Sequence, residues 1–278
     1  MLSRQPEPNN PSAPPAQKLR LRYAKRGKLR FASHRDIARV FERALRRAGV
    51  PMAYSQGFNP RPRVSWVGAA PTGTASEAEY VEVSVVTPLD PKLLASELDA
   101  ALPPGIDVLE AVISEGGSLA ERIDGSQWRI EVAGISADEL RPAVAALLAA
   151  DAVEVDRMTK NGMRRMDVRP ALVSVQVSAS PTSEDGDGGA AARGCGILEV
   201  VVRQTTPVVR PDDVLSAIRV VAALSPPEPV KATRLAQGRL DDEGHLADPF
   251  APDRGTAEAS VVAREPEPGQ HIVERPAD

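Results

Sequence analysis

Residues 18–49 read KLRLRYAKRGKLRFASHRDIARVFERALRRAG, and the change of period within this stretch decides the fold of the N-terminal half. Up to residue 31, apolar and basic residues alternate around a turn at Lys25-Arg26-Gly27. The apolar set is Leu19, Leu21, Tyr23, Leu29 and Phe31, and the basic set is Lys18, Arg20, Arg22, Lys28 and Arg30. Because a period of two is typical of half-buried strands, we expect two strands or one long bent strand. The basic face is interpreted as a groove for phosphate, and a solvated edge is the alternative.

The stretch from Ser33 to Gly49 predicts an amphipathic helix. Ser33 is a good N-cap, Asp36 completes a shortened capping box, and Gly49 followed by Pro51 ends the helix. The apolar residues fill one arc of the helical wheel, and a separate arc holds Arg35, Arg39, Arg43, Arg46 and Arg47. Solvated helix faces usually mix Glu with Lys or Arg, so this arc is interpreted as an anion-binding face, with a plain solvated face as the alternative.

The next segment, SQGFNPRPRVSWVGA, is a loop rich in Gly and Pro that runs into a strand near Val64 to Val67. The loop carries Phe58, Asn59, Arg61 and Arg63, which suit the stacking of an unpaired base and the binding of its phosphate. The alternative is that Phe58 anchors its own loop as a buried hydrophobic residue.

Charge is concentrated in this part of the chain. Residues 18–66 hold fourteen Lys and Arg against Asp36 and Glu42, whereas the whole chain of 278 residues has a net charge of −4. Six of the nine aromatic residues also lie there. A cationic, aromatic surface on an acidic body is typical of a polyanion site, with RNA as the first candidate. The candidate RNA contacts are Arg20, Arg22, Lys25, Lys28, Arg30, His34, Arg35, Arg39, Arg43, Arg46, Arg47, Phe58, Asn59, Arg61 and Arg63.

The remaining pattern predicts an α+β fold made of two tandem ferredoxin-like (βαββαβ) domains. A polar loop is expected at 72–79, and helices are expected at 90–102, 137–150 and 211–224. Strands are expected at 80–86, 106–113, 128–132, 153–158, 163–178, 196–202 and 230–235. The expected boundaries are a disordered arm at 1–17, a basic domain at 18–115, a second domain at 116–236 and a disordered acidic, Pro-rich tail at 237–278.

The second half carries its own basic hairpin around an Asn161-Gly162 turn. Its cations are Arg157, Lys160, Arg164, Arg165 and Arg169. They either extend the first basic surface across a cleft between the domains or form an exposed hairpin without a partner.

Several classes of protein are excluded by what the sequence lacks. No apolar run reaches the roughly 20 residues of a membrane span, and the N-terminus has no signal-peptide core. The single cysteine, Cys195, cannot form an intrachain disulfide, so we expect a cytoplasmic protein. There is no phosphate-binding glycine loop and no Cys/His cluster for zinc or iron–sulfur, so we expect no cofactor and no metal.

One constellation offers chemistry. His34 opens the arginine helix, Tyr23 and Lys25 lie at the preceding turn, and Ser55 and Arg61 lie in the following loop. A His that converges with a Lys or Tyr on a cationic groove is able to cleave RNA without metal, with the 2′-hydroxyl as nucleophile. Contact with phosphate and a purely structural role are the alternatives for His34.

These motifs resemble the bacterial radical-SAM-linked domain of unknown function, in its free-standing actinobacterial form. The shared elements are a Tyr-x-Lys-x-Gly turn, Ser-His-x-Asp, an Arg-rich helix, Ser-x-Gly-Phe-Asn-Pro and a Gly-x-x-Ser-x-x-Glu loop. They fall on Tyr23, Lys25, Gly27, Ser33, His34, Asp36, Arg43, Arg46, Arg47, Ser55, Gly57, Phe58, Asn59, Pro60, Gly73, Ser76 and Glu79. The resemblance is strong over residues 18–82 and weaker to residue 223, and the tails have no counterpart.

The resemblance implies an accessory role. Family members are fused behind a radical-SAM enzyme or stand free, typically beside genes for ribonuclease E/G-type and ribosomal proteins. This chain lacks the cysteines of such an enzyme. We therefore expect an RNA-binding accessory protein for tRNA or rRNA, linked to radical-SAM-dependent modification or RNA processing, whose partner is a radical-SAM enzyme or a ribonuclease E/G-type protein. The alternatives are a metal-independent endoribonuclease that uses His34, as fold analogy with CRISPR repeat-processing endoribonucleases suggests, and a protein adaptor that docks an acidic partner.

Overall fold

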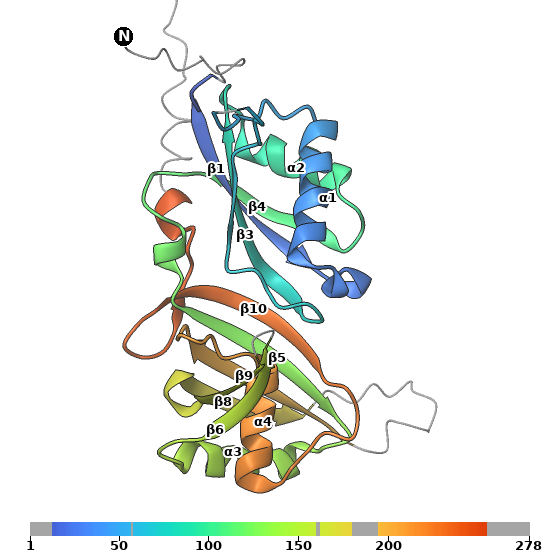
Figure 1. Ribbon diagram of the computed structural model, residues 1–278, viewed down its shortest axis with the longest axis vertical. Coiled ribbons are helices and arrows are strands. Elements are labelled where there is room, and N and C mark those ends of the chain that lie inside the picture. The colour runs from blue at the N-terminus through green and yellow to red at the C-terminus, as the bar shows by residue number, and fades with distance from the viewer. Residues whose placement is uncertain (1–12, 57, 160–161, 180–193, 255–278) are drawn as a thin grey trace, which may run out of the picture.

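The structure is a computed structural model that describes residues 13–56, 58–159, 162–179 and 194–254 (Figure 1). Most of the expected N-terminal arm, the stretch after residue 254, and the Lys160-Asn161 part of the hairpin turn lie outside the described residues. The mixed α/β class is confirmed, because helices and strands alternate along the chain.

The first half contains four strands, two α-helices and one 3-10 turn. In chain order they are β1 (Gln17–Lys25), η1 (Gly27–Phe31), α1 (His34–Arg47), β2 (Val64–Val67), β3 (Ala75–Val85), α2 (Pro91–Ala101) and β4 (Ile106–Ile113). The helix limits follow from local sequence, since the side chains of Ser33 and Asp90 each accept a hydrogen bond from the first turn of α1 or α2.

The second half begins with the short turn η2 (Ala120–Arg122). It continues with β5 (Gly125–Ala133), α3 (Ala137–Ala149), β6 (Glu154–Thr159), β7 (Gly162–Asp167), η3 (Arg169–Ala171), β8 (Leu172–Ala179), β9 (Cys195–Arg203), α4 (Pro211–Ala222), β10 (Lys231–Leu240) and β11 (Leu246–Ala247). Ser136 and Glu139 form a full capping box at the start of α3.

One nine-stranded sheet runs through both halves in the order β4-β1-β3-β10-β5-β9-β8, with β2 paired to β3 and β11 to β10. Within each half all neighbouring strands are antiparallel. The halves are joined by a parallel pairing of β10 with β3, at Thr233 with Ala75 and at Arg234 with Ser76. Strands β6 and β7 form a separate hairpin.

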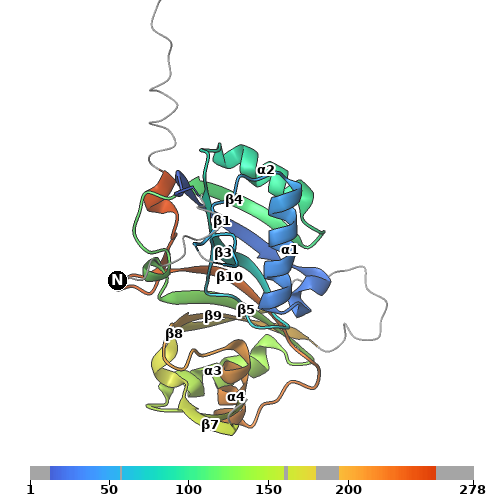
Figure 2. The same ribbon diagram turned by 45° about the horizontal axis from the view of Figure 1, so that its top comes forward.

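In each half two helices lie against the sheet (Figure 2), and an apolar core lies between helices and sheet. In the first half, α1 and α2 cover one face of β1 and β3, with Leu21, Phe41 and Leu98 at the centre. In the second half, α3 and α4 cover β5 and β9. Within the described parts of the chain, none of the helices has the length and apolarity that a membrane span requires.

Three local expectations differ from the structure. Residues 27–31 form a 3-10 turn rather than a second strand, since Gly27 has a φ of +54° and Leu29 N bonds back to Arg26 O. The expected strand at 163–178 is broken by η3, where Pro170 lacks the N–H that a ladder needs. The loop expected at 72–79 instead becomes β3 from Ala75 onward.

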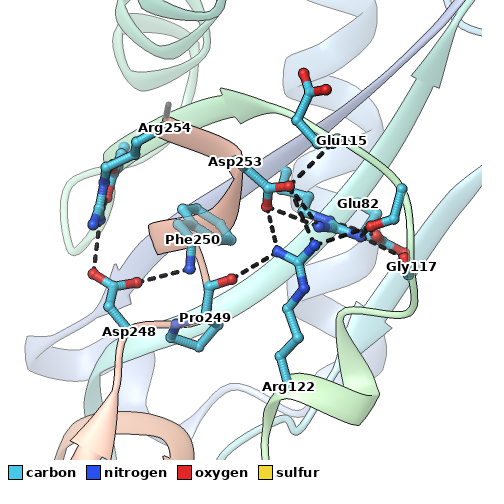
Figure 3. Close-up of polar contacts among 12 residues, drawn as sticks. Glu82, Glu115, Gly117, Arg122, Asp248, Pro249, Phe250, Asp253 and Arg254 are labelled. Carbon is cyan, nitrogen blue, oxygen red and sulfur yellow. Dashed lines mark hydrogen bonds and ion pairs between the residues drawn. The ribbon is translucent and has the colours of Figure 1, made fainter. Parts of the chain in front are cut away.

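The expected tail also differs, because residues 237–254 are part of the body. Strand β10 continues to Leu240, and the segment 248–254 lies on the face of the first sheet that α1 and α2 do not cover (Figure 3). Phe250 is fully buried there, with its ring centroid 5.3 Å from that of Tyr80. Composition alone does not reveal this attachment, because a single buried aromatic residue stands in a polar, Pro-rich stretch.

We call residues 248–254 the C-terminal clasp. Its Asp253 carboxylate is buried and accepts hydrogen bonds from Arg20 Nη1 at 2.8 Å, from Arg122 Nη1 at 2.7 Å and from Glu115 N at 3.0 Å. Arg20, also fully buried, donates Nε to Glu82 at 2.9 Å and Nη2 to the carbonyl oxygens of residues 116 and 117. The clasp therefore neutralises a cation on the face expected to be basic and open.

We predict that Asp253→Asn lowers the free energy of unfolding by about 3 kcal/mol. This is the lower end of the range for breaking a buried ion pair, because Glu82 still contacts Arg20. Urea unfolding followed by circular dichroism measures the change. The matched control, Asp242→Asn, removes an exposed carboxylate from the neighbouring turn and should stay within about 0.5 kcal/mol of wild type. Equal midpoints for the two variants would contradict the role given to the clasp.

A second prediction concerns acid. Burial alone would raise the pKa of Asp253, but the hydrogen bonds from Arg20 and Arg122 outweigh it and hold the pKa below its ordinary value. A carboxyl with a depressed folded-state pKa stabilises the fold above its unfolded pKa of about 3.9, and this contribution is lost as pH falls through the folded value. Wild-type stability should therefore fall more steeply than that of Asp253→Asn below about pH 4, as measured by urea unfolding at several pH values.

Candidate nucleic-acid interface

The arginine helix α1 forms as the sequence predicts. Ser33 Oγ accepts from Asp36 N at 3.3 Å and donates to Asp36 Oδ2 at 2.6 Å. The hydrogen bond from Ser33 is the main reason why the pKa of Asp36 is lowered. Ile37, Phe41 and Leu45 are buried against the sheet. This anchoring directs the opposite face of the helix to solvent.

Five exposed arginines lie on that face, and we call them the α1 arginine surface: Arg35, Arg39, Arg43, Arg46 and Arg47. Arg39 lies 3.8 Å from the Asp36 carboxylate, and Arg47 Nη1 donates to Ala101 O at 3.1 Å. In the described ranges Arg35, Arg43 and Arg46 form no ion pair, and Glu42 forms none either. The surface is therefore cationic with almost no internal compensation.

The loop between α1 and β2 presents an aromatic ring to solvent. Phe58 is 86% exposed, which argues against its being a buried anchor, and Asn59 is exposed beside it. Two mutual hydrogen bonds hold the base of the loop, from Ser55 N to Arg61 O at 2.8 Å and from Arg61 N to Ser55 Oγ at 3.0 Å. The side chains of Arg61 and Arg63 remain exposed.

An aromatic cluster holds β2 against α1. The Trp66 ring meets those of Phe41 and His34 edge-on, with centroids 5.1 Å and 5.3 Å apart. It also meets Tyr23 at 6.0 Å. His34 is thus an exposed residue at the start of α1 that packs on a tryptophan edge, and the loop that leads into β2 is attached to the same part of the helix.

Two of the expected contacts on β1 must be corrected. Arg20 is fully buried under the clasp, and Lys25 is 3% exposed. Arg22 is half-buried and lies 3.6 Å from Glu110. Strand alternation places Arg20 and Arg22 on one face, where Asp253 of the clasp and Glu82 pair with Arg20 and Glu110 pairs with Arg22. Lys25 follows a register shift after Tyr23 and is buried elsewhere, near the carbonyl oxygens of Ala70 and Pro71. Arg20 and Lys25 cannot contact RNA in this structure, whereas Arg22 stays partly exposed.

The other two candidate contacts of this segment, Lys28 and Arg30, lie in η1. Lys28 is exposed. Arg30 is half-buried, and its guanidinium carbon lies 4.6 Å from the centre of the Phe31 ring. Both are on the surface next to the first turn, so they remain candidates for contact with an anion.

A buried polar network that the sequence does not announce joins the two halves. Arg234 on β10 pairs with Glu79 on β3, and its Nε donates to Ser76 Oγ at 3.4 Å. Glu79 Oε2 also accepts from Ala70 N at 3.0 Å. Ser76 and Glu79 belong to the Gly-x-x-Ser-x-x-Glu motif of the resemblance, which is the one sequence signal for this network. Arg234 lies in a strand whose sequence has no such motif.

Lys25 belongs to the same network. Its Nζ approaches the carbonyl oxygens of Ala70 and Pro71 at 3.5 and 3.4 Å. Burial lowers the pKa of Lys25, Glu79 opposes the shift, and Arg234 adds to it. Burial also raises the pKa of Tyr23 well above its ordinary value. Because both side chains are buried, neither meets the exposed His34 at a surface groove, and the expected acid–base constellation is not assembled in that form.

The basic hairpin of the second half is partly neutralised. Arg157 Nη1 lies 2.9 Å from Asp213 Oδ2, and Arg165 Nε lies 2.9 Å from Asp156 Oδ1. Arg169 donates to the carbonyl oxygens of Leu148 and Leu172. Arg164 is exposed, and Lys160 and Asn161 lie outside the described residues. The hairpin thus offers fewer uncompensated cations than α1.

One group of side chains has the composition of a metal site. Asp241, Glu243 and His245 in the turn between β10 and β11 place their ligand atoms within 4.8 Å of one another. All three are exposed, and His245 Nδ1 lies 3.3 Å from Asp241 Oδ2. An exposed acidic turn of this kind is common without a metal, so it supports no metal centre.

Comparisons with known proteins give a family but no activity. A search of curated proteins found no match. Among solved structures, the chain is similar to the encapsulated DyP-type peroxidase from Mycobacterium smegmatis, at 10% identity over 84% of this chain and 94% of that chain, with a TM-score of 0.20. A TM-score this low carries no argument about fold or function. A family model described as "Uncharacterized protein conserved in bacteria (DUF2344)" matches residues 18–211. Because this match spans well over half of the sequence, the chain belongs to the DUF2344 family of uncharacterized bacterial proteins.

Proposed function

We propose that this protein binds RNA through the α1 arginine surface and the adjoining loop with Phe58. The observation that carries the proposal is the accumulation of five exposed arginines on one helix face. Among the residues that the structure describes, their only acidic contact is Asp36, at 3.8 Å from Arg39. Residues 35 to 47 extend over about 18 Å of helix, which is long enough to contact several successive phosphates of one strand.

The loop supplies a second kind of contact. Because the Phe58 ring is 86% exposed, it can stack on a base with little rearrangement of the protein. Base stacking on aromatic side chains requires unpaired nucleotides, so the combination of a phosphate-binding helix and an exposed ring favours RNA with loops or bulges. This supports structured RNA such as tRNA or rRNA as the ligand.

The accessory role belongs to the same proposal. The protein presents RNA, in the cytoplasm, to a radical-SAM enzyme or to a ribonuclease E/G-type protein. Its support is the motif resemblance over residues 18–82 together with the lack of a cysteine triplet that could hold an iron–sulfur cluster in this chain.

We also propose that the two halves are two ferredoxin-like units joined edge to edge. The support is that the strand orders β4-β1-β3-β2 and β10-β5-β9-β8 have the same form, with two helices in each half. The β6–β7 hairpin is then an insertion between α3 and β8, and the β3–β10 pairing joins the two sheets.

We predict that the triple variant Arg39→Glu, Arg43→Glu, Arg46→Glu binds tRNA at least 100-fold more weakly than wild type, a factor of the size expected for about 3 kcal/mol. The three side chains face away from the core, so the helix should form as before. Fluorescence anisotropy at several salt concentrations measures both affinity and salt slope. Loss of three phosphate contacts should reduce the slope of log K against log salt by about 2 to 3.

The matched control for this variant is Lys92→Glu, Arg219→Glu, Arg239→Glu, which changes net charge equally at exposed positions outside α1. It should lose less than about tenfold in affinity. Equal losses for the two triple variants would show that only overall charge matters, and unchanged affinity in the α1 variant would overturn the proposal. Retained RNA binding combined with loss of an acidic protein partner would favour the adaptor.

We predict that Phe58→Ala weakens binding to RNA with unpaired nucleotides by about 5- to 150-fold, since stacking contributes about 1–3 kcal/mol per base. Binding to a perfect duplex should change much less. Leu93→Ala is the control, because Leu93 is an exposed apolar residue, 55% accessible, on α2. A lower melting temperature for Phe58→Ala with unchanged affinity for RNA would contradict the stacking role.

The same assays separate an RNA-binding accessory from an endoribonuclease. Labelled RNA incubated with the protein in EDTA should be recovered intact if the protein only binds it. Cleavage that is present in wild type and absent in His34→Gln would instead establish His34 as a catalytic residue and replace the accessory proposal.

A further inference from the structure

A cavity lies at the junction of the two halves, away from the α1 arginine surface. Its volume is about 240 Å³. One wall is the loop after β2, which includes Gly68 and Pro71, and the other walls come from the start of β5, the end of β9 and the segment that leads into α4. Trp128 and Val209 give the cavity an apolar side. Pockets for drug-sized ligands are roughly 300–1,000 Å³, so this cavity suits a smaller molecule.

The charged residues that line the cavity are all cationic. They are Arg203, Arg210 and Arg234, and no Asp or Glu lines it. Arg234 forms an ion pair with Glu79. Arg203 and Arg210 are exposed, and neither forms an ion pair with any residue in the ranges that the structure describes. Two exposed arginines without an ion pair in the described ranges therefore line one half-open pocket, and Arg210 also has a weaker electrostatic interaction with Asp213.

Arg210 occupies a position that disfavours a cation. It is the N-cap of α4, where the helix dipole is positive and Ser, Thr, Asp or Asn is preferred. Asp213, in the first turn, does not line the cavity. Its Oδ2 already accepts hydrogen bonds from Arg210 N at 2.7 Å and from Arg157 Nη1 at 2.9 Å. Asp212 and Asp213 already place negative charge in this first turn, so a bound anion would pair with the Arg210 guanidinium rather than with the dipole.

The third arginine is held rigidly. Arg234 is 4% exposed and bonded to Glu79 and Ser76, and its guanidinium carbon lies 5.4 Å from the centre of the Trp128 ring. Trp128 is fixed in turn by a bond from its Nε1 to Ser126 Oγ at 2.9 Å. The floor of the cavity is therefore preorganised, which reduces the ordering cost of binding.

From the half-open cavity, its all-cationic charged lining and the two exposed arginines that form no ion pair in the described ranges, we propose that this site binds a small phosphate-bearing molecule. Arg203 and Arg210 hold the phosphate group by bidentate, charge-assisted hydrogen bonds, for which guanidinium geometry is well suited. The Trp128 and Val209 side receives the apolar part of the ligand, where one is present. This site is independent of the proposed RNA interface, since it shares no residue with α1 or with the loop of Phe58.

The test is isothermal titration calorimetry of the full chain with inorganic phosphate and pyrophosphate, and with acetate at the same ionic strength. Pyrophosphate should bind measurably and acetate at least tenfold more weakly. The double variant Arg203→Gln, Arg210→Gln should weaken pyrophosphate binding at least tenfold. Arg219→Gln, an exposed arginine of α4 that does not line the cavity, is the matched control and should bind as wild type does.

The site is overturned if wild type gives no heat with either phosphate probe, if acetate binds as well as pyrophosphate, or if the double variant binds unchanged. Both substituted side chains are exposed, so the substitutions should not alter the folded structure. An unchanged melting temperature would verify this. The α1 triple variant should retain pyrophosphate binding, and the cavity variant should retain RNA binding. Failure of one proposal is thereby distinguishable from failure of the other.

Discussion

The buried ion pair between Glu79 and Arg234 is the interaction on which the arrangement of the two halves depends. The direct backbone pairing between the halves is short, at Thr233 with Ala75 and at Arg234 with Ser76. Two charged groups at 2% and 4% exposure are costly to separate once buried, because each would leave the other without compensation. The pair therefore specifies that β10 meets the edge of β3. Through the contact between Arg234 and Trp128 it also holds the floor of the junction cavity in place.

The basic side chains of this protein fall into two physical classes that look alike in the sequence. Those on β1 carry specific acidic partners and are part of the framework, as Arg20 is with Glu82 and Asp253. Those on α1 have almost no partners and remain hydrated, so their charge is available to a polyanion. The net charge of a segment does not distinguish these two classes, because they differ in whether other residues of the same chain supply the counter-charge.

The sequence predicts the elements well where local physics dominates. The limits of α1 and β4 follow from an N-cap, a glycine and strand alternation, and they agree with the structure to within a residue or two. It fails where the local backbone conformation overrides the side-chain pattern and where a distant segment decides the outcome. Residues 27–31 alternate like a strand but turn at Gly27, and Asp253 meets Arg20 from 233 positions away. No local pattern encodes such a contact, and for the same reason Arg20 and Lys25 looked accessible while Arg234 went unnoticed.

The clasp also sets an order of events during synthesis. The first half of the chain leaves the ribosome with β1, α1, β3 and α2, yet Arg20 then has no Asp253 and the face with Tyr80 has no Phe250. Domains generally fold as units as they emerge, but this unit stays incomplete until the clasp has been translated. A nascent chain that is stalled before residue 248 therefore exposes together an apolar face and an arginine that only Glu82 pairs with, a combination that chaperones and proteases can recognise as unfinished.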